Sequence, residues 1–123
     1  GIDISPEMMA VARERGGYRH LIGADLNARL PLADGAYQGA ICSGTFTCGH
    51  LRANCLDELI RVLAAGACFV FTVKLDVWES YGFKSKLNQL QAAGFLDRLV
   101  VEPGRLYANS TEPDGLFCSL RRL

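Results

Sequence analysis

The chain is 123 residues long and half of its residues are apolar, so it is large enough to form one domain with a substantial core. Lysine and arginine together number 13, as do aspartate and glutamate, which leaves no net charge. Such a chain lacks the basic surface typical of proteins that bind nucleic acid or anionic membranes, so we expect neither as a partner. Its most apolar stretch, residues 64–73, is too short to cross a bilayer and fits a buried strand.

The five cysteines are widely spaced, and no two of them form the Cys-x-x-Cys pair that is typical of metal and redox sites: Cys42, Cys48, Cys55, Cys68 and Cys118. The two histidines do not complete a metal cluster, so no metal is expected. The odd number of cysteines argues against a disulfide framework, and we expect a reduced protein of the cytoplasm. The opening Gly1-Ile2-Asp3 is typical of the end of a strand, so we expect a chain truncated at its N-terminus.

The first third of the chain contains one clear helix and two candidate strands. Ser5-Pro6-Glu7 predicts a helix start, because serine caps the first turn, proline fits its first position and an acid stabilises it. Gly16-Gly17 ends this helix. Residues 18–24 then predict a short strand, residues 27–36 a loop, and residues 37–42 a buried strand.

The rest of the chain continues the alternation of strand and helix. Leucine and isoleucine recur at helical spacing between residues 51 and 63, which predicts an amphipathic helix. Strand followed by helix predicts the α/β class with a mostly parallel sheet. No helix separates the last two strands, so we expect an antiparallel pair at the edge of the sheet. The other expected elements are a loop at 43–50, a strand at 67–74, a helix at 79–93, a strand at 95–102, a loop at 103–115 and a strand at 116–120.

Candidate binding residues follow three of the predicted strands, where open α/β sheets bind their ligands. Asp3 ends the first segment, where a carboxylate can accept hydrogen bonds from two ribose hydroxyls; a helix-capping acid is the alternative. Asp25-Leu26 can accept a bond from an exocyclic amine and pack on a purine ring, although an ordinary turn has the same sequence. Ser43-Gly44-Thr45 forms either a small-residue loop that a ligand approaches closely or a plain strand-to-helix connection.

Three segments, in this order, resemble the class I S-adenosylmethionine-dependent methyltransferases. They are GIDISPEMM at residues 1–9, ADLNARLPLADGAYQGAIC at residues 24–42 and RVLAAGACFVFTVK at residues 61–74. In the family, the first segment has an acid and a serine just before a helix. The second has an acid followed by a loop that contains Leu-Pro, and the third joins the end of a helix to a strand. The sequence is most similar to the Williams–Beuren-region methyltransferase-like group. The resemblance implies a Rossmann-like sheet and S-adenosyl-L-methionine as the cofactor.

The resemblance also implies a role for each matching residue. Asp3 would bind the ribose hydroxyls, and Asp25 would accept a hydrogen bond from the adenine amine. On the substrate side we expect Thr45, His50 and Tyr107, and His50 is also a candidate general base. No catalytic residue is assigned. Six residues are expected to contact the cofactor, first its ribose and adenine and then its methionine part: Asp3, Ile4, Asp25, Leu26, Ser43 and Gly44.

The sequence departs from the family pattern in three places. It contains neither the family's first strand, which lies between the second and fourth, nor the glycine-rich loop after that strand. We therefore expect a gap in the sheet and poor cofactor binding by this chain alone. Gln38 replaces an acid whose role in the family is mostly structural. Residues 43–46 are not the Asn/Asp-Pro-Pro-aromatic loop used to methylate nitrogens of nucleobases and glutamine, which disfavours those acceptors.

We therefore expect residues 1–123 to be a partial methyltransferase domain whose intact parent transfers a methyl group to a small molecule. Two alternatives stay open on the sequence. One is another nucleotide-binding α/β enzyme, such as an NAD-dependent dehydrogenase that uses Asp3 on the ribose. The other is a degenerate methyltransferase-like domain without activity. The sequence assigns neither the methyl acceptor nor the oligomeric state.

Overall fold

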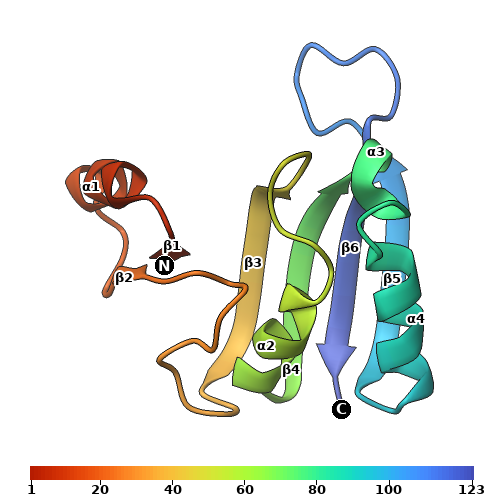
Figure 1. The fold of residues 1–123 in the computed structure, drawn as a ribbon, viewed down its shortest axis with the longest axis horizontal. Helices are drawn as coiled ribbons and strands as arrows, with labels where there is room; N and C mark the ends of the chain where they lie inside the picture. The colour runs from red at the N-terminus through yellow and green to blue at the C-terminus, as the bar shows by residue number, and fades with distance from the viewer.

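A computed structural model describes residues 1–123, the whole sequence, and alternates strands with helices (Figure 1). This alternation confirms the predicted α/β class. In chain order the elements are β1 (Ile2–Asp3), α1 (Pro6–Arg15), β2 (Ile22–Gly23), β3 (Tyr37–Phe46), α2 (Cys55–Val62), β4 (Leu63–Lys74), α3 (Leu75–Trp78), α4 (Phe83–Ala92), β5 (Leu96–Gly104) and β6 (Gly115–Arg122).

Four strands form the main sheet in the order β3-β4-β6-β5. β3 and β4 run parallel, whereas β6 runs antiparallel to both β4 and β5. The predicted antiparallel pair at the sheet edge is confirmed, with β5 outermost. The helices α3 and α4 carry the chain from β4 past the position of β6, and residues 105–114 return it to fill that position (Figure 1).

Residues 1–29 form a separate N-terminal unit. β1 and β2 pair in parallel with each other and share no hydrogen-bonded neighbour with the main sheet. The amide of Ile22 donates to the Gly1 carbonyl at 2.9 Å, and the N-terminal ammonium of Gly1 donates to the His20 carbonyl at 2.8 Å. The sheet is therefore interrupted between β1 and β3, which is where the sequence predicts a gap.

Two boundaries around the first loop of the main sheet differ from the prediction. β3 continues to Phe46 instead of ending at Cys42, because Gly44 adopts a φ of 76° and the strand bulges before it pairs again with β4. The helix α2 begins at Cys55 rather than at Leu51. Residues 47–54 stay a loop because they bond to a distant turn, where the Tyr81 carbonyl and hydroxyl both accept hydrogen bonds from this loop.

Other boundaries differ because of single glycines and strand pairing. The helix predicted at residues 79–93 begins only at Phe83, as α4, since Gly82 has a φ of 81°, outside the helical region. The short helix α3 before it was not predicted. β2 occupies only two residues of the predicted strand at 18–24, since its one partner, β1, is equally short. β4 begins at Leu63 rather than Ala67, because Leu63 already pairs with Tyr37 of β3.

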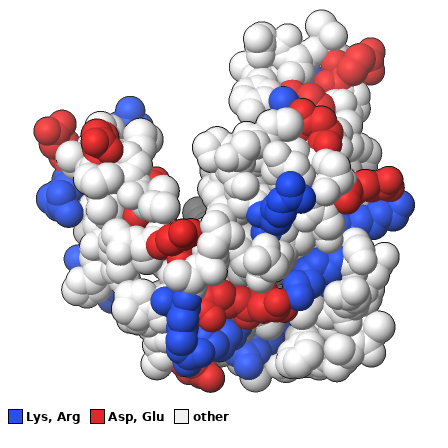
Figure 2. Space-filling view, viewed as in Figure 1, with Lys and Arg blue, Asp and Glu red and all other residues white.

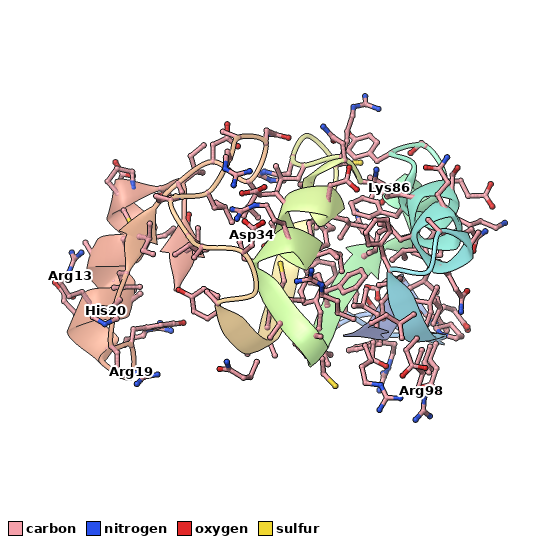
Figure 3. All side chains as sticks on the ribbon, turned by 90° about the horizontal axis from the view of Figure 1, so that it is seen from below. Arg13, Arg19, His20, Asp34, Lys86 and Arg98 are labelled. Carbon is pink, nitrogen blue, oxygen red and sulfur yellow. The ribbon has the colours of Figure 1, made fainter.

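The helices α2, α3 and α4 all pack on one face of the main sheet (Figures 1 and 3). Alternate residues of β4 point into this layer, and Phe69, Phe71 and Val73 are at most 1% exposed. The ring of Phe46 lies 5.7 Å from that of Phe71 and 5.0 Å from that of Phe83 on α4, between centroids. The core is therefore one aromatic-rich layer between this face and the helices. None of the helices is long and apolar enough to span a membrane.

The segment before β3 is fixed to α2 by the side chains of Glu58 and Arg61, here called the Arg61–Glu58 network. Glu58 Oε1 accepts a hydrogen bond from the Leu30 amide at 2.6 Å. Arg61 donates to the Leu32 carbonyl at 2.9 Å, to Glu58 Oε1 at 2.5 Å and to the Asp34 carboxylate. The Arg61 and Glu58 side chains are only 14% and 16% exposed. The network therefore fixes the segment that connects the N-terminal unit to β3.

Truncation of Phe46 tests the aromatic layer. We expect Phe46→Ala to lower the free energy of unfolding by about 3–5 kcal/mol, since a fully buried ring is lost and a cavity is left. The matched control is Phe95→Ala, because the Phe95 side chain is 51% exposed and should cost less than about 1 kcal/mol. Urea denaturation measures both, and equal losses for the two variants would contradict the proposed core.

Acid titration tests the Arg61–Glu58 network. The hydrogen bond from Arg61 lowers the pKa of Glu58 to about 2, against about 4.3 in an unfolded chain. The folded state therefore binds this proton more weakly, and the stabilisation is present above about pH 4.5 and lost as the pH falls toward about 2. We expect the stability difference between the wild type and Glu58→Gln to shrink over that range in urea titrations.

The control for this titration is Glu14→Gln, which alters an exposed acid on α1. Its stability difference from the wild type should stay small and constant with pH. A Glu58→Gln difference that is the same at neutral and at acidic pH would contradict the lowered pKa of Glu58.

Candidate functional site

Two of the predicted site residues, Asp3 and Asp25, lie at the carboxyl ends of neighbouring parallel strands. Asp3 is the last residue of β1 and pairs with Gly23, the last residue of β2. The Ala24 amide donates to the Asp3 carbonyl at 3.1 Å, which holds the two strand ends together. Asp25 follows at once, so both carboxylates emerge at the same edge of the N-terminal unit. The structure therefore brings together residues that are 22 positions apart in the sequence.

Each of these carboxylates fixes its own turn with one oxygen. Asp3 Oδ1 accepts a hydrogen bond from the Ser5 amide at 2.9 Å, and Asp25 Oδ1 accepts one from the Asn27 amide at 2.8 Å. These bonds orient the carboxylates before any ligand arrives. The second oxygen of each accepts no hydrogen bond from the protein, and both residues are exposed. Each carboxylate therefore keeps one oxygen available for a hydroxyl or amine donor.

Apolar side chains lie next to both carboxylates. Ile4 is 69% exposed although it is large and apolar, so its surface is available to a ligand. Leu26 is half-buried and packs against the edge of the main core. A ribose and an exocyclic amine need carboxylate oxygens that accept their hydrogen bonds, and a flat purine ring needs an apolar surface to pack against. The residues present therefore fit the adenosine part of the cofactor that the sequence resemblance implies.

Ser43 and Gly44 lie at the other candidate position, in the bulge near the end of β3. The Gly44 amide donates to Thr72 Oγ1 of β4 at 3.3 Å, which fixes the bulge. No atom lies within 4 Å of where a Cβ at Gly44 would be, so space does not require glycine there. Its φ of 76° does, because this region is strained for other residues. The result is an exposed stretch of backbone that a ligand can approach closely.

The three residues expected on the substrate side come from β3, the loop after it and the loop between β5 and β6. Thr45 is half-buried in the bulge, and His50 is exposed in the loop that follows. That loop is fixed by Tyr81, whose hydroxyl accepts a hydrogen bond from the Gly49 amide at 3.0 Å and whose ring lies 4.6 Å below the Arg52 guanidinium.

Tyr107 is 48% exposed in the loop between β5 and β6. This loop is tied to the same end of the sheet, because the Asp114 carbonyl accepts a hydrogen bond from the Leu75 amide at 3.0 Å and the Asp114 carboxylate accepts one from the Leu106 amide at 2.5 Å. Tyr107 therefore belongs to a fixed loop at the carboxyl end of β4. Its place on the substrate side stays a prediction.

A polar group at the end of β4 was not identified as a unit in the sequence. Asp76 Oδ2 lies 3.2 Å from Lys74 Nζ and accepts a hydrogen bond from the Cys48 thiol at 3.5 Å. The hydrogen bond to Asp76 raises the pKa of the Cys48 thiol, which therefore stays protonated and is a poor nucleophile. No sequence spacing indicates this group, because Cys48 and Asp76 are 28 residues apart.

The site residues lie on two bodies with a hollow between them (Figure 2). Asp3, Ile4, Asp25 and Leu26 belong to the N-terminal unit, whereas the bulge of β3 and the substrate-side residues belong to the main sheet. A cavity of about 320 Å³ also lies between residues 26–29 and the first turns of α2, and Leu26 is the one predicted site residue that lines it. The site is therefore assembled as two groups rather than around one closed pocket.

Comparison with known proteins finds a family that covers more than half of the chain. A protein-family profile described as "Methyltransferase domain" matches residues 1–71. This range includes β1 to β3, α2 and most of β4, together with all six residues expected to contact the cofactor. A search of curated proteins finds no match.

Several solved structures are similar in fold. A methyltransferase from Methanosarcina mazei, described as S-adenosylmethionine-dependent, superposes with a TM-score of 0.72 at 16% identity over 100% of this chain and 81% of that one. The N-methyltransferase NodS from Bradyrhizobium japonicum, in complex with S-adenosyl-L-homocysteine, superposes with a TM-score of 0.62 at 18% identity. The match covers 98% of this chain and 64% of that one. The tRNA (m1A58) methyltransferase TrmI from Aquifex aeolicus superposes with a TM-score of 0.67 at 13% identity. The match covers 99% of this chain and 52% of that one.

At these identities the structures establish a shared fold, whereas the profile match establishes the family. The closer similarity to the Williams–Beuren-region group stays a prediction, since none of the comparisons tests it. The profile match and the fold agree with the resemblance found in the three sequence segments. The chain therefore belongs to the methyltransferase domain family and has the fold of the class I S-adenosylmethionine-dependent methyltransferases.

Proposed function

We propose that the N-terminal unit binds the adenosine part of S-adenosyl-L-methionine. Asp3 accepts hydrogen bonds from the ribose hydroxyls, and Asp25 accepts one from the adenine amine. Ile4 and Leu26 pack against the adenine ring. The observation that carries the proposal is the pairing of β1 with β2, which places two exposed carboxylates at one edge, each with an unused oxygen.

On this proposal Ser43 and Gly44 lie along the methionine part, and Thr45, His50 and Tyr107 lie on the acceptor side. The cofactor supplies an electrophilic methyl group that passes to the acceptor by direct displacement, so the protein contributes mainly by positioning. An acceptor that loses a proton in this step needs a base, and His50 is the exposed imidazole in the loop after β3. The Cys48 thiol has no part in the transfer.

We further propose that the acceptor is a small molecule. The formal net charge is zero, and acidic and basic side chains are interspersed on the face seen in Figure 2 rather than gathered in a basic stripe. The loop at residues 43–46 also lacks the Asn/Asp-Pro-Pro-aromatic sequence. The similar Aquifex enzyme acts on tRNA, so an acceptor assay should include RNA as a comparison. The free cysteines fit a reduced, cytoplasmic location.

A second candidate function is a methyltransferase-like domain that binds cofactor weakly and has no activity of its own. The interruption between β1 and β3 favours it, since the two halves of the site share no strand pairing. On this view residues 1–123 form a partial domain. The active enzyme requires a competent cofactor affinity, whereas the inactive domain requires only a weak one. Measurement of cofactor binding therefore separates the two candidates.

Substitution of Asp3 tests the adenosine site. We expect Asp3→Ala to weaken binding of S-adenosyl-L-homocysteine by about 10- to 150-fold, or about 1.5–3 kcal/mol, the range for hydrogen bonds to a charged group. Titration followed by amide chemical shifts measures this even when binding is weak. The largest shifts should fall at residues 3–5 and 24–27.

Two controls separate binding from folding at Asp3. Asp3→Asn keeps an oxygen for the Ser5 amide but loses the charge, so its affinity should lie between those of the wild type and Asp3→Ala. Glu14→Ala removes an exposed acid of the same unit and should leave binding unchanged. Unchanged affinity in Asp3→Ala, with the fold intact, would remove Asp3 from the site.

The affinity itself separates the two candidate functions. Because β1 and β3 are not joined, we expect the 123-residue chain to bind S-adenosyl-L-methionine more weakly than the low-micromolar range. Calorimetry on the purified chain measures this directly. Low-micromolar binding would show that the two halves already form a competent site, and it would favour the active enzyme over the weakly binding domain.

A further inference from the structure

Lys74 ends β4 at the edge of the main sheet from which two loops of the expected acceptor side extend (Figure 1). These loops are residues 47–54, here called the first acceptor loop, and residues 105–114, the second acceptor loop. The residue before Lys74, Val73, pairs with Phe46 at the end of β3. Lys74 therefore lies at the carboxyl ends of two neighbouring parallel strands, where open α/β sheets bind their ligands.

Both acceptor loops interact with the ion pair that Lys74 forms with Asp76. Lys74 Nζ lies 3.2 Å from Asp76 Oδ2, and the same oxygen accepts a hydrogen bond from the Cys48 thiol of the first acceptor loop. The hydrogen bond to Asp76 raises the pKa of Lys74, and Cys48 and Tyr107, which belongs to the second acceptor loop, act in the same direction. The Lys74 ammonium is therefore charged at neutral pH and lies within electrostatic range of both loops.

The other two lysines of the chain also form ion pairs, but these lie on α4 and away from the acceptor loops. Lys84 Nζ is 2.7 Å from Glu79 Oε1, and Lys86 Nζ is 2.6 Å from Asp57 Oδ2. The ion pair of Lys74 is the longest of the three, and only its carboxylate oxygen is shared with a second donor. Lys74 is therefore the lysine whose charge the protein neutralises least.

We propose that Lys74 binds a carboxylate group of the methyl acceptor, which makes the acceptor a small carboxylic acid. The proposal rests on the proposed function, because it places the acceptor in that same site. An ammonium has three N–H donors and Asp76 contacts it with one oxygen, so donors are left for a ligand. A carboxylate suits this position better than a doubly charged phosphate, because the Asp76 carboxylate repels the phosphate more strongly. Lys74 orients the acceptor and takes no part in the transfer of the methyl group.

Nuclear magnetic resonance of the lysine side chains tests the proposal, with benzoate as the probe and Lys84 and Lys86 as internal controls. We expect benzoate to shift the ε-methylene signals of Lys74 until they saturate, while those of the two control lysines stay in place. Benzamide has nearly the same shape without the charge and should bind about tenfold more weakly, since hydrogen bonds between charged groups are stronger. Equal shifts at all three lysines, shifts without saturation, or tighter binding of phenyl phosphate than of benzoate overturn the proposal.

Lys74→Gln and Lys84→Gln are the matched pair of variants, followed by the amide signals of residues 74–76. Lys74→Gln should abolish saturable benzoate binding, whereas Lys84→Gln should leave it unchanged, and circular dichroism excludes loss of the fold. Neither variant should alter the shifts that S-adenosyl-L-homocysteine causes at residues 3–5 and 24–27. Benzoate binding that survives Lys74→Gln overturns this inference while those cofactor shifts persist. Absence of the cofactor shifts from the wild type overturns the proposed function instead.

Discussion

The position of the candidate site depends on the Arg61–Glu58 network. The N-terminal unit carries Asp3 and Asp25 but shares no strand pairing with the main sheet. Its connection is the segment before β3, and that segment is fixed because Glu58 and Arg61 satisfy its backbone amide and carbonyl groups. Arg122 of β6 also donates to the carbonyls of Arg61 and Leu63, so the end of α2 is tied to the centre of the sheet. One partly buried ion pair therefore relates the two halves of the site.

Features that depend on neighbouring residues were predictable from the sequence. Ser5 caps α1 as expected, since its hydroxyl accepts a hydrogen bond from the Met8 amide at 3.2 Å. The acids at the ends of β1 and β2 were also identified, because a strand followed by an acid is a local pattern. Features that join distant residues were not, such as the bond between Leu30 and Glu58, 28 positions apart. The bulge of β3 was missed because the pairing of Phe46 with Val73 overrides the turn-like sequence before it.

The interrupted sheet and the packing of the helices on one side of it are two aspects of one arrangement. Every helix that contacts the main sheet lies on the same side, and β3 has a hydrogen-bonded neighbour on one edge only. The core is well packed between β4, α2 and α4, and Leu26 is the residue of the N-terminal unit that packs against it. On the proposed function, the unit supplies the groups that bind the adenosine, whereas the main sheet contains the core and the residues on the methionine and acceptor sides. The candidate residues therefore lie in two groups, although the chain has one well-packed core.

The central claim is that the cofactor's adenosine lies against the N-terminal unit, between Ile4 and Leu26. The most direct measurement is a set of intermolecular nuclear Overhauser effects between S-adenosyl-L-homocysteine and the chain labelled on its isoleucine and leucine methyl groups. The account predicts contacts from the adenine protons to the methyl groups of Ile4 and Leu26. Adenine contacts confined to methyl groups elsewhere in the chain, with none to these two residues, would contradict it.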